Sequence, residues 1–314
     1  MSILSIYEAL KYVTKAELFI TASPIQKVNT GYKVTGFAKV YTICGMCTIL
    51  SCLLIGIVGQ MCTQSDISNI TGNLSVLAKF IAHLELIISV TAYIISNISQ
   101  QIQRKNHIEL IECLHKLDTT LIKEFQVNMN YHKIVRKNVL LLLLFPIFFL
   151  TFTLPYVVVL FKHKMIFVPL IAVSYIISYM ALGVSSYAAM NFADLIRIRF
   201  RLFQKLLNPE FLKKRYKNEK VRMKKFKILV ETYQDTFYIM KKLSEVYGVS
   251  LLMVHFHDFI MTTNQLYYVY WKSTNGNIGD IKFLNFIFWM VPIVWKSIFL
   301  PLYMHLMMNE VRKP

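Results

Sequence analysis

The chain has 314 residues, of which 55% are hydrophobic and 17% charged, and its mean hydropathy is +0.47. Soluble domains carry about 25% charged residues, so this composition excludes an ordinary soluble protein and indicates one that crosses a membrane several times. The formal net charge of +18 does not indicate nucleic-acid binding, because the basic residues lie in loops between long apolar segments.

Six apolar segments are long enough to cross the hydrocarbon core of a bilayer, which takes about twenty helical residues. They lie at roughly Phe37–Gln60, Leu77–Ile98, Val139–Leu160, Ile166–Met190, Val246–Tyr270 and Phe283–Met308. The predicted fold is therefore an all-α, polytopic transmembrane helical bundle. Because no signal peptide precedes the first span, that span is expected to act as an uncleaved signal anchor.

The basic residues predict the orientation of the bundle. With the N-terminus inside, the inner segments hold 28 of the 35 Lys and Arg residues and the outer loops hold 4, and 15 of them lie between Arg197 and Lys242 alone. An excess of Lys and Arg marks the cytoplasmic side of a membrane protein. The N-terminus is therefore predicted to be cytoplasmic, in the plasma membrane, and we expect the basic stretch to contact the lipid of the inner leaflet.

This orientation divides the chain into five parts. They are a cytoplasmic tail at 1–36, spans one to four at 37–190 with a short cytoplasmic helix near 108–126, a long basic cytoplasmic helical segment at 191–245, spans five and six at 246–308, and a cytoplasmic end at 309–314.

Apolar residues recur at helical spacing in the inner segments. In the first of them this spacing runs from Leu110 to Phe125. After the fourth span a helix is predicted to continue to Leu207 and to end at Asn208-Pro209. A polar linker around Lys213–Lys225 and a second helix continuous with the fifth span are expected to follow.

The motifs of catalysis and metal binding are missing from the sequence, so neither an enzyme nor a cofactor is expected. Cys44 and Cys47 have the CxxC spacing, but they lie inside an apolar span without a second pair, which argues against a redox or zinc role. His255 and His257 lie about 200° apart around a helix, so they are not expected to share a metal.

Ionisable residues inside spans each cost about 2.5–3.5 kcal/mol on insertion scales, so they tend to face a cavity or a partner. Asp258 and Lys296 lie near the middles of the fifth and sixth spans, at similar depth on antiparallel neighbours. They are predicted to form a buried ion pair, and the alternative that each faces water in a vestibule stays open. His83 and Glu85, in the outer half of the second span, are candidate ligand-binding residues.

Polar and aromatic side chains gather where the fifth span reaches the outer surface: Asn264, Tyr267 and Tyr268. An aromatic belt at the interface explains such a group. A pocket for a small organic molecule explains it as well, because aromatic walls with a few polar groups suit such ligands. That pocket would be completed by Tyr156, Tyr175, Tyr179 and Trp289 from other spans.

Three helical stretches, with the order of the parts, resemble the insect gustatory receptors: 114–121, 199–207 and 233–252, which read LHKLDTTL, RFRLFQKLL and YQDTFYIMKKLSEVYGVSLL. The resemblance implies a tastant-gated cation channel of four like or related subunits, with an outer-facing pocket for a small-molecule tastant and inner helices that make the subunit contacts. The odorant receptors of the same superfamily are the alternative within this class.

The family's most specific motif, Thr-Tyr followed by apolar residues and Gln-Phe in a seventh span, is not found, and Thr232-Tyr233-Gln234 does not match it. We therefore expect an incomplete or truncated copy. A non-conducting membrane scaffold and a transporter remain alternatives of a different class, although a transporter often has internal repeats, which this sequence lacks.

Overall fold

The computed structural model describes residues 5–28, 31–62, 76–140, 142–144, 147, 167–274 and 281–312. Nearly all of them are helical, which confirms the predicted all-α fold. The labelled helices are α1 (Ile6–Phe19), α2 (Gly36–Cys62), α4 (Val76–Ile102), α5 (Arg104–Phe125), α7 (Phe167–Leu207), α8 (Pro209–Arg215), α9 (Glu219–Thr274) and α10 (Ile281–Arg312), and residues 131–140 and 142–144 are helical as well. A hairpin of β1 (Ile25–Val28) and β2 (Gly31–Val34) pairs Ile25 with Val34.

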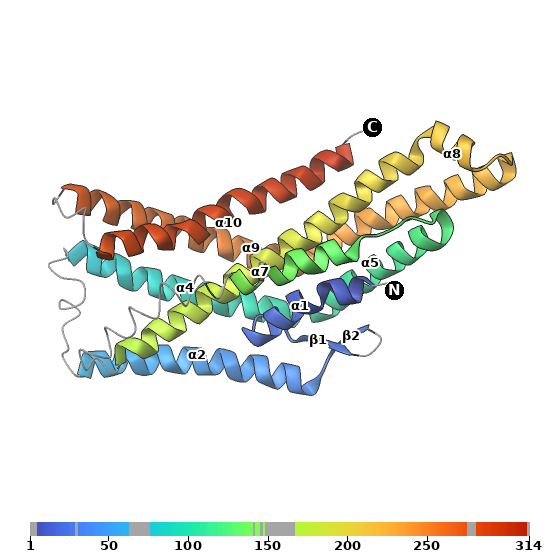
Figure 1. Ribbon diagram of the computed structural model, residues 1–314. Coiled ribbons are helices and arrows are strands. Elements are labelled where there is room, and N and C mark those ends of the chain that lie inside the picture. The colour runs from blue at the N-terminus through green and yellow to red at the C-terminus, as the bar shows by residue number, and fades with distance from the viewer. Residues whose placement is uncertain are drawn as a thin grey trace.

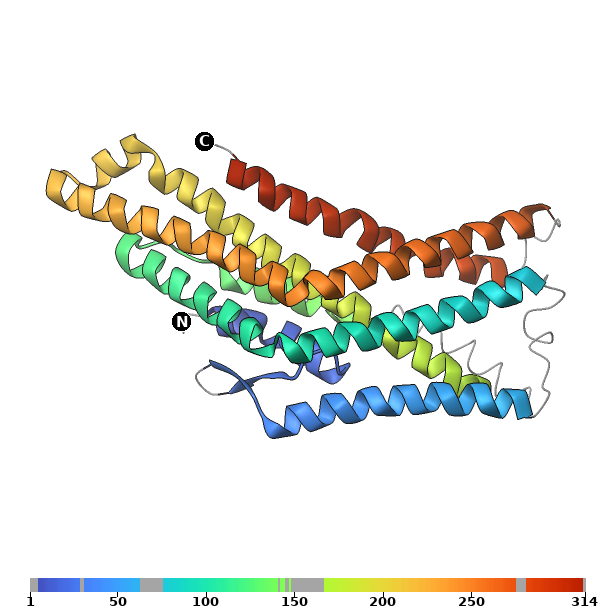
Figure 2. The ribbon, with the colours of Figure 1, turned by 180° about the vertical axis from the view of Figure 1, so that it is seen from behind.

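The long helices form a bundle in which α2 and α10 lie on opposite sides, with α7 and α9 between them (Figures 1 and 2). Within its most apolar window α7 is 56% buried, against 22% for α2 and 28% for α10. α7 is therefore the central helix, and the apolar faces of α2 and α10 point outward, as lipid-facing surfaces do.

Three helices of the described part of the chain are long and apolar enough to cross a membrane, at Gly36–Gly59, Pro169–Leu207 and Met290–Val311. They coincide with the predicted first, fourth and sixth spans. The predicted second and fifth spans lie within α4 and α9, whereas 139–160 lies largely outside the described residues. The second, third and fifth spans therefore remain predictions.

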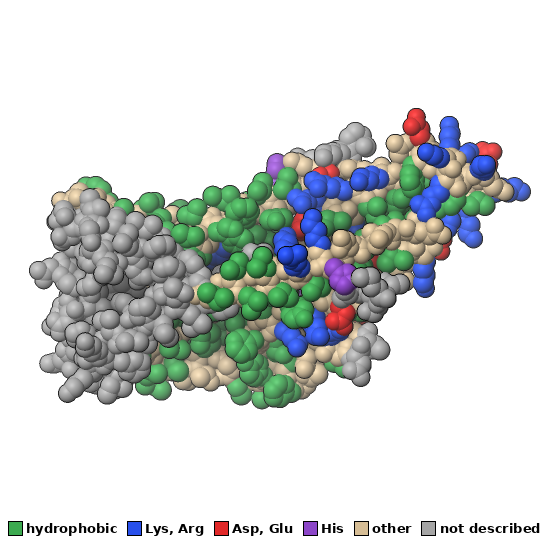
Figure 3. Space-filling view, in the orientation of Figure 1, with side chains coloured by type: hydrophobic (Ala, Val, Ile, Leu, Met, Phe, Trp, Pro, Cys, Tyr) green, Lys and Arg blue, Asp and Glu red, His purple; other side chains and the backbone are tan. Residues whose placement is uncertain are grey.

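The half of the bundle that the basic residues predict to face the cytoplasm, called the inner half from here on, has a hydrophobic core built from α1, α5, α7, α9 and α10. The apolar face of α5 that periodicity predicts, from Leu110 to Phe125, is at most 3% exposed. Each such Leu or Phe contributes about 2 kcal/mol through burial. Lys and Arg side chains gather on the surface of this half, and apolar side chains cover the middle of the molecule (Figure 3).

The connection between α7 and α9 differs from the prediction. α7 ends at Leu207 as expected, but the linker predicted around Lys213–Lys225 is wrong. Asn208 Oδ1 accepts a hydrogen bond from the backbone N–H of Glu210, and Pro209 occupies the first turn, so a new helix, α8, begins there. Only 216–218 separate α8 from the start of α9.

The N-terminal segment predicted as a tail is folded onto the core. The buried face of α1 carries Ile6, Leu10 and Val13, each 0% exposed, at helical spacing. After α1, Thr21 has φ 60°, and its hydroxyl shares a hydrogen bond with Tyr93 of α4.

The same threonine explains the glycine of the CxxC sequence. A Cβ placed on Gly45 of α2 would lie 2.2 Å from Thr21 Cγ2, so only glycine permits this approach. Cys44 and Cys47 are free and exposed on α2. The close approach of Thr21, in the turn after α1, therefore accounts for Gly45 of α2.

Candidate functional site

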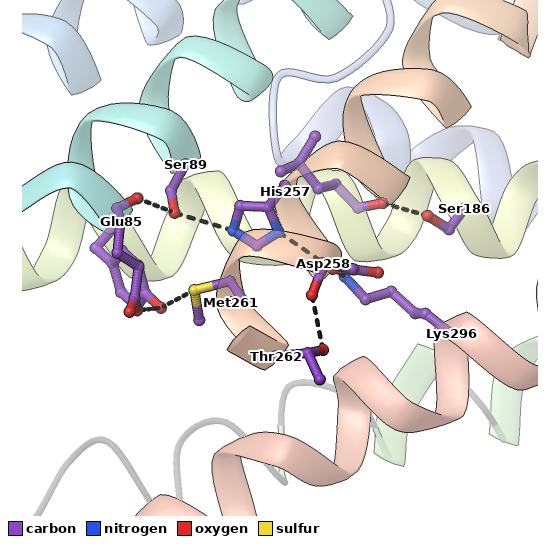
Figure 4. Close-up of polar contacts among 10 residues, drawn as sticks. Glu85, Ser89, Ser186, His257, Asp258, Met261, Thr262 and Lys296 are labelled. Atoms are coloured by element: carbon purple, nitrogen blue, oxygen red, sulfur yellow. Dashed lines mark hydrogen bonds and ion pairs between the residues drawn. The ribbon is translucent and has the colours of Figure 1, made fainter. Parts of the chain in front are cut away.

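Four helices place polar and aromatic side chains together in the bundle, and we call this group the four-helix polar cluster (Figure 4). α4, α7 and α9 each contribute two cluster members that are four residues apart and therefore lie on the same face of their helix. The cluster comprises Glu85 and Ser89 on α4, Tyr175 and Tyr179 on α7, His257, Asp258, Met261 and Asn264 on α9, and Lys296 on α10.

One part of the cluster is the outer carboxylate site, formed by Glu85, Tyr175 and Asn264. The Tyr175 hydroxyl donates to Glu85 Oε1 at 2.8 Å and lies 3.4 Å from the sulfur of Met261. Asn264 Nδ2 donates to Glu85 Oε2 at 3.3 Å. Glu85, Tyr175 and Asn264 are all partly exposed, so this site lies closer to the protein surface than Asp258 and Lys296 do.

A second part of the cluster is the central ion pair, formed by Asp258 and Lys296. Lys296 Nζ donates to Asp258 Oδ1 at 2.7 Å, and each side chain is only 2% exposed. His257 lies 3.1 Å from Asp258 Oδ1 through Nδ1 and 2.9 Å from Ser89 Oγ through Nε2. Ser89 Oγ also donates its single proton to the backbone carbonyl of Glu85 at 2.8 Å, so the donor and acceptor roles of the two His257 nitrogens follow from its tautomer and protonation state.

Aromatic rings connect the two parts. The Lys296 ammonium lies 4.7 Å from the centroid of the Tyr179 ring, a cation–π distance. The Tyr179 ring lies 6.4 Å from that of Tyr175, tilted by 23°, and 5.6 Å from that of His257. A continuous set of contacts therefore runs from the partly exposed Glu85 to the buried Lys296.

The structure brings together six of the residues that the sequence predicts for binding or for the ion pair: Glu85, Tyr175, Tyr179, Asn264, Asp258 and Lys296. Tyr267 lies on α9 near Asn264 and is partly exposed. Tyr156 lies outside the described residues, and so do the side chains of His83, Tyr268 and Trp289.

Three cluster members escaped the sequence reasoning: Ser89, His257 and Met261. The sequence pattern suggests His257 only as a metal ligand together with His255, whereas the structure leaves His255 exposed and His257 0% exposed. Because His257 is next to Asp258 and Ser89 is four residues after Glu85, the spacing contained the signal that could have identified both.

Two further buried polar groups lie in the inner half of the molecule. The first, the inner ion pair, joins Arg199 of α7 to Asp118 of α5, with side chains 1% and 2% exposed. Arg199 Nε and a terminal nitrogen each donate to one carboxylate oxygen, at 3.0 and 2.6 Å, and the Tyr131 hydroxyl donates to Asp118 Oδ2 at 2.5 Å. Both oxygens of Asp118 are therefore satisfied.

The second group joins the N-terminal helix to α5 and α9. The Tyr247 hydroxyl lies 3.1 Å from both Glu17 Oε1 and His107 Nε2. Burial raises the pKa of Glu17 to about 8, although the Tyr247 hydroxyl opposes the shift, and burial lowers the pKa of His107 to about 3. Glu17 is therefore mainly protonated and His107 neutral at pH 7.

Long apolar helices that enclose a connected polar cluster define a multi-pass helical membrane protein with an internal site. The sequence model described as "7tm Chemosensory receptor" matches residues 27–314. The chain therefore belongs to the 7tm chemosensory receptor family, which comprises receptors and not enzymes. It is also similar to the Drosophila melanogaster protein named "Putative gustatory receptor 57a", with 27% identity over 291 residues that make up 90% of this chain and 70% of that protein. These matches confirm the predicted family.

Proposed function

We propose that this chain is a subunit of a tastant-gated cation channel and that the four-helix polar cluster binds the tastant. The observation that carries the proposal is the continuity of α9, which runs unbroken from Glu219 to Thr274. Asn264 and Asp258 on this helix belong to the cluster. On the same helix Tyr247 contacts Glu17, and Lys242 forms an ion pair with Glu109 of α5 at 3.1 Å.

This continuity supports a mechanism in which a ligand acts at a distance. A ligand that changes the contacts of the outer carboxylate site shifts the position of α9 relative to α4 and α10. Because α9 is one helix, the shift is transmitted to its inner part. There α5 and α1 pack against it and would pass the movement to the pore.

We further propose a tetramer of like or related subunits in the plasma membrane, with the N-terminus cytoplasmic. Large apolar side chains on the inner part of α9 support subunit contacts there, because Met223, Phe226, Phe237 and Tyr238 are 42–65% exposed. The side on which Lys and Arg gather in Figure 3 supports the orientation.

Contact with the inner leaflet is proposed for exposed basic residues near the predicted spans, such as Lys241, whose side chain is 74% exposed. Those at 213–227 lie farther away. The 28 residues from Glu219 to Val246 span about 40 Å of helix, well beyond a Debye length of about 8 Å.

The test is whole-cell current in cells that express the full chain, alone and with related subunits, during application of a broad tastant panel. The proposal expects an evoked cation current that Asn264→Ala weakens, whereas Thr263→Ala, an exposed neighbour on α9, leaves it unchanged. Activation by volatile odorants alone would favour the odorant alternative. Ligand uptake without current would favour a transporter, and silence in every arm would favour a scaffold.

A further inference from the structure

The two carboxylates of the four-helix polar cluster, Asp258 and Glu85, differ in their charge partners. The carboxylate of Asp258 is matched by the ammonium of Lys296 at 2.7 Å, and His257 contacts the same carboxylate. Within the described part of the chain, the carboxylate of Glu85 accepts hydrogen bonds from Tyr175 and Asn264, which are neutral donors. Among the described side chains Glu85 therefore has no positive partner, whereas Asp258 has one.

A carboxylate held between helices away from bulk water is costly unless a cation compensates it. The two neutral hydrogen bonds replace part of its hydration but leave the charge in place. A neutral ligand would add another hydrogen bond, whereas a cationic ligand would also cancel the charge. The unpaired carboxylate therefore favours a cation over a neutral molecule of the same shape.

The aromatic side chains next to Glu85 have the chemistry that binds an organic cation. Tyr179 already holds an ammonium group, because Lys296 Nζ lies 4.7 Å from its ring centroid. The Tyr175 ring stacks on it with only a 23° tilt and carries the hydroxyl that donates to Glu85. A carboxylate beside a tyrosine ring is a site at which ammonium groups bind through charge and cation–π attraction.

Accessibility separates Glu85 from the other carboxylate of the cluster. Asp258 is 2% exposed and occupied by Lys296, so an incoming cation would have to displace a buried ion pair. Glu85, Tyr175 and Asn264 are partly exposed. A ligand can therefore reach Glu85 without breaking the central ion pair.

We propose that the outer carboxylate site binds ligands that carry a protonated amine or a quaternary ammonium group, with Glu85 as the charge partner and Tyr175 as the aromatic wall. This inference rests on the proposal that the cluster is the ligand site. It adds the chemical class of the ligand.

A first experiment tests the charge of the site without knowing its ligand. Asn264→Cys is made in the full chain with its five native cysteines replaced by alanine, and folding is checked by size-exclusion chromatography. The thiol is treated with methanethiosulfonates that carry a trimethylammonium or a sulfonate group, and each rate is normalised to that of a free thiol.

We expect the cationic reagent to react about tenfold faster than the anionic one, because a single unpaired carboxylate attracts cations in a low-dielectric cleft. Adding Glu85→Gln should bring the ratio close to unity. A ratio near unity with Glu85 present would overturn the inference, and so would a lack of reaction with both reagents, because a ligand would then have no route to the site.

A second experiment uses matched ligands on the native chain. Phenethylamine is compared with 2-phenylethanol, and choline with 3,3-dimethylbutan-1-ol, so each cation has a neutral partner of similar shape. The readout is evoked current together with the thermal midpoint of the purified protein. At least one cation should act at about tenfold lower concentration than its neutral partner, and Glu85→Gln should abolish that preference while Glu85→Asp retains it.

The outcomes separate this inference from the proposed function. Equal action of a cation and its neutral partner, or a preference that survives Glu85→Gln, overturns the ligand class and leaves the receptor proposal standing. Silence toward all four compounds while other tastants evoke current has the same meaning. Silence toward every compound tested, including the broad tastant panel, counts against the proposed function itself.

Discussion

The central ion pair and the inner ion pair are equally buried, yet they are constructed differently. In the inner pair Arg199 binds both oxygens of Asp118, Tyr131 adds a third donor, and a terminal nitrogen of Arg199 also donates to the carbonyl of Leu195 at 2.5 Å. In the central pair Lys296 meets a single oxygen of Asp258. The other oxygen, Oδ2, accepts no hydrogen bond from any described residue.

This difference indicates which region is fixed and which can rearrange. A bidentate arginine holds its carboxylate in one geometry, so the inner pair ties α5 rigidly to α7. A lysine is a point charge on a flexible stem, and the free oxygen of Asp258 can take a new donor. The contact of α9 with α10 is therefore the adjustable one, as a receptor that moves these helices on ligand binding requires.

The largest effect is expected from Arg199→Met. It leaves Asp118 buried without a countercharge, which should cost about 3–5 kcal/mol of unfolding free energy and remove most folded protein from the monodisperse peak in size-exclusion chromatography. The matched control is Arg222→Met, because Arg222 pairs with Glu219 at 3.9 Å on the surface and should cost less than about 1 kcal/mol. Equal losses would show that the inner pair does not fix the fold.

The central pair should tolerate change better. Lys296→Met should cost about 2–3 kcal/mol, somewhat less than Arg199→Met, because His257 can take up a proton and replace part of the lost charge. The exchange Asp258→Lys with Lys296→Asp should restore surface expression above that of either single reversal. If the exchange rescues no better than the single changes, the two charges do not depend on each other.

The buried group of the N-terminal helix predicts a plateau in stability against pH. Glu17 has a folded pKa of about 8 against an ordinary 4.5, so its contribution is present at low pH and is lost as pH rises to about 8. His107 has a folded pKa of about 3 against 6.5, so its contribution is lost as pH falls below 6.5. The two slopes oppose each other between pH 4.5 and 6.5.

Thermal midpoints of the detergent-purified chain should therefore be level between pH 4.5 and 6.5 and fall on both sides. On each side the free energy of unfolding should fall by about 1.4 kcal/mol per pH unit. Glu17→Gln should abolish the alkaline limb and extend the acid limb, which His107 alone then produces, up to about pH 6.5. Glu219→Gln, at a side chain 84% exposed, is the control that should leave both limbs unchanged. An alkaline limb that survives Glu17→Gln would refute the assignment.

The spacing of apolar residues predicted those parts of the fold that depend on the sequence of a single helix. The apolar face from Leu110 to Phe125 and the end of α7 at Leu207 follow from local spacing and a local stop signal. The same spacing is present in α1, at Ile6, Leu10 and Val13. Because this segment is too short to span a membrane, the sequence predicts a tail there and not a packed helix. The linker prediction failed because the count of charges outweighed Asn208 and Pro209, which begin a helix.

The part of the site that could be predicted is the part that depends only on how deep each residue lies within its membrane span. Asp258 and Lys296 were matched by their positions along two spans, without any knowledge of side-chain contacts. Arg199 could not be recognised as buried, because it looks like one of many basic residues and its partner Asp118 lies 81 residues away. Contacts of this kind depend on how helices pack, which a single sequence does not specify.

The smallest effect tests whether saturation of the carboxylate makes the inner pair rigid. Tyr131→Phe removes one donor to Asp118 but leaves the arginine in place, so it should cost about 1.5–2 kcal/mol, the range for a buried hydrogen bond to a charged group. Tyr238→Phe is the control, because its hydroxyl donates to Glu109 at 2.6 Å on the surface and its side chain is 43% exposed. That change should cost less than about 0.5 kcal/mol. If both variants melt at the wild-type temperature, the third donor adds nothing, and the rigidity of the inner pair must come from the bidentate arginine alone.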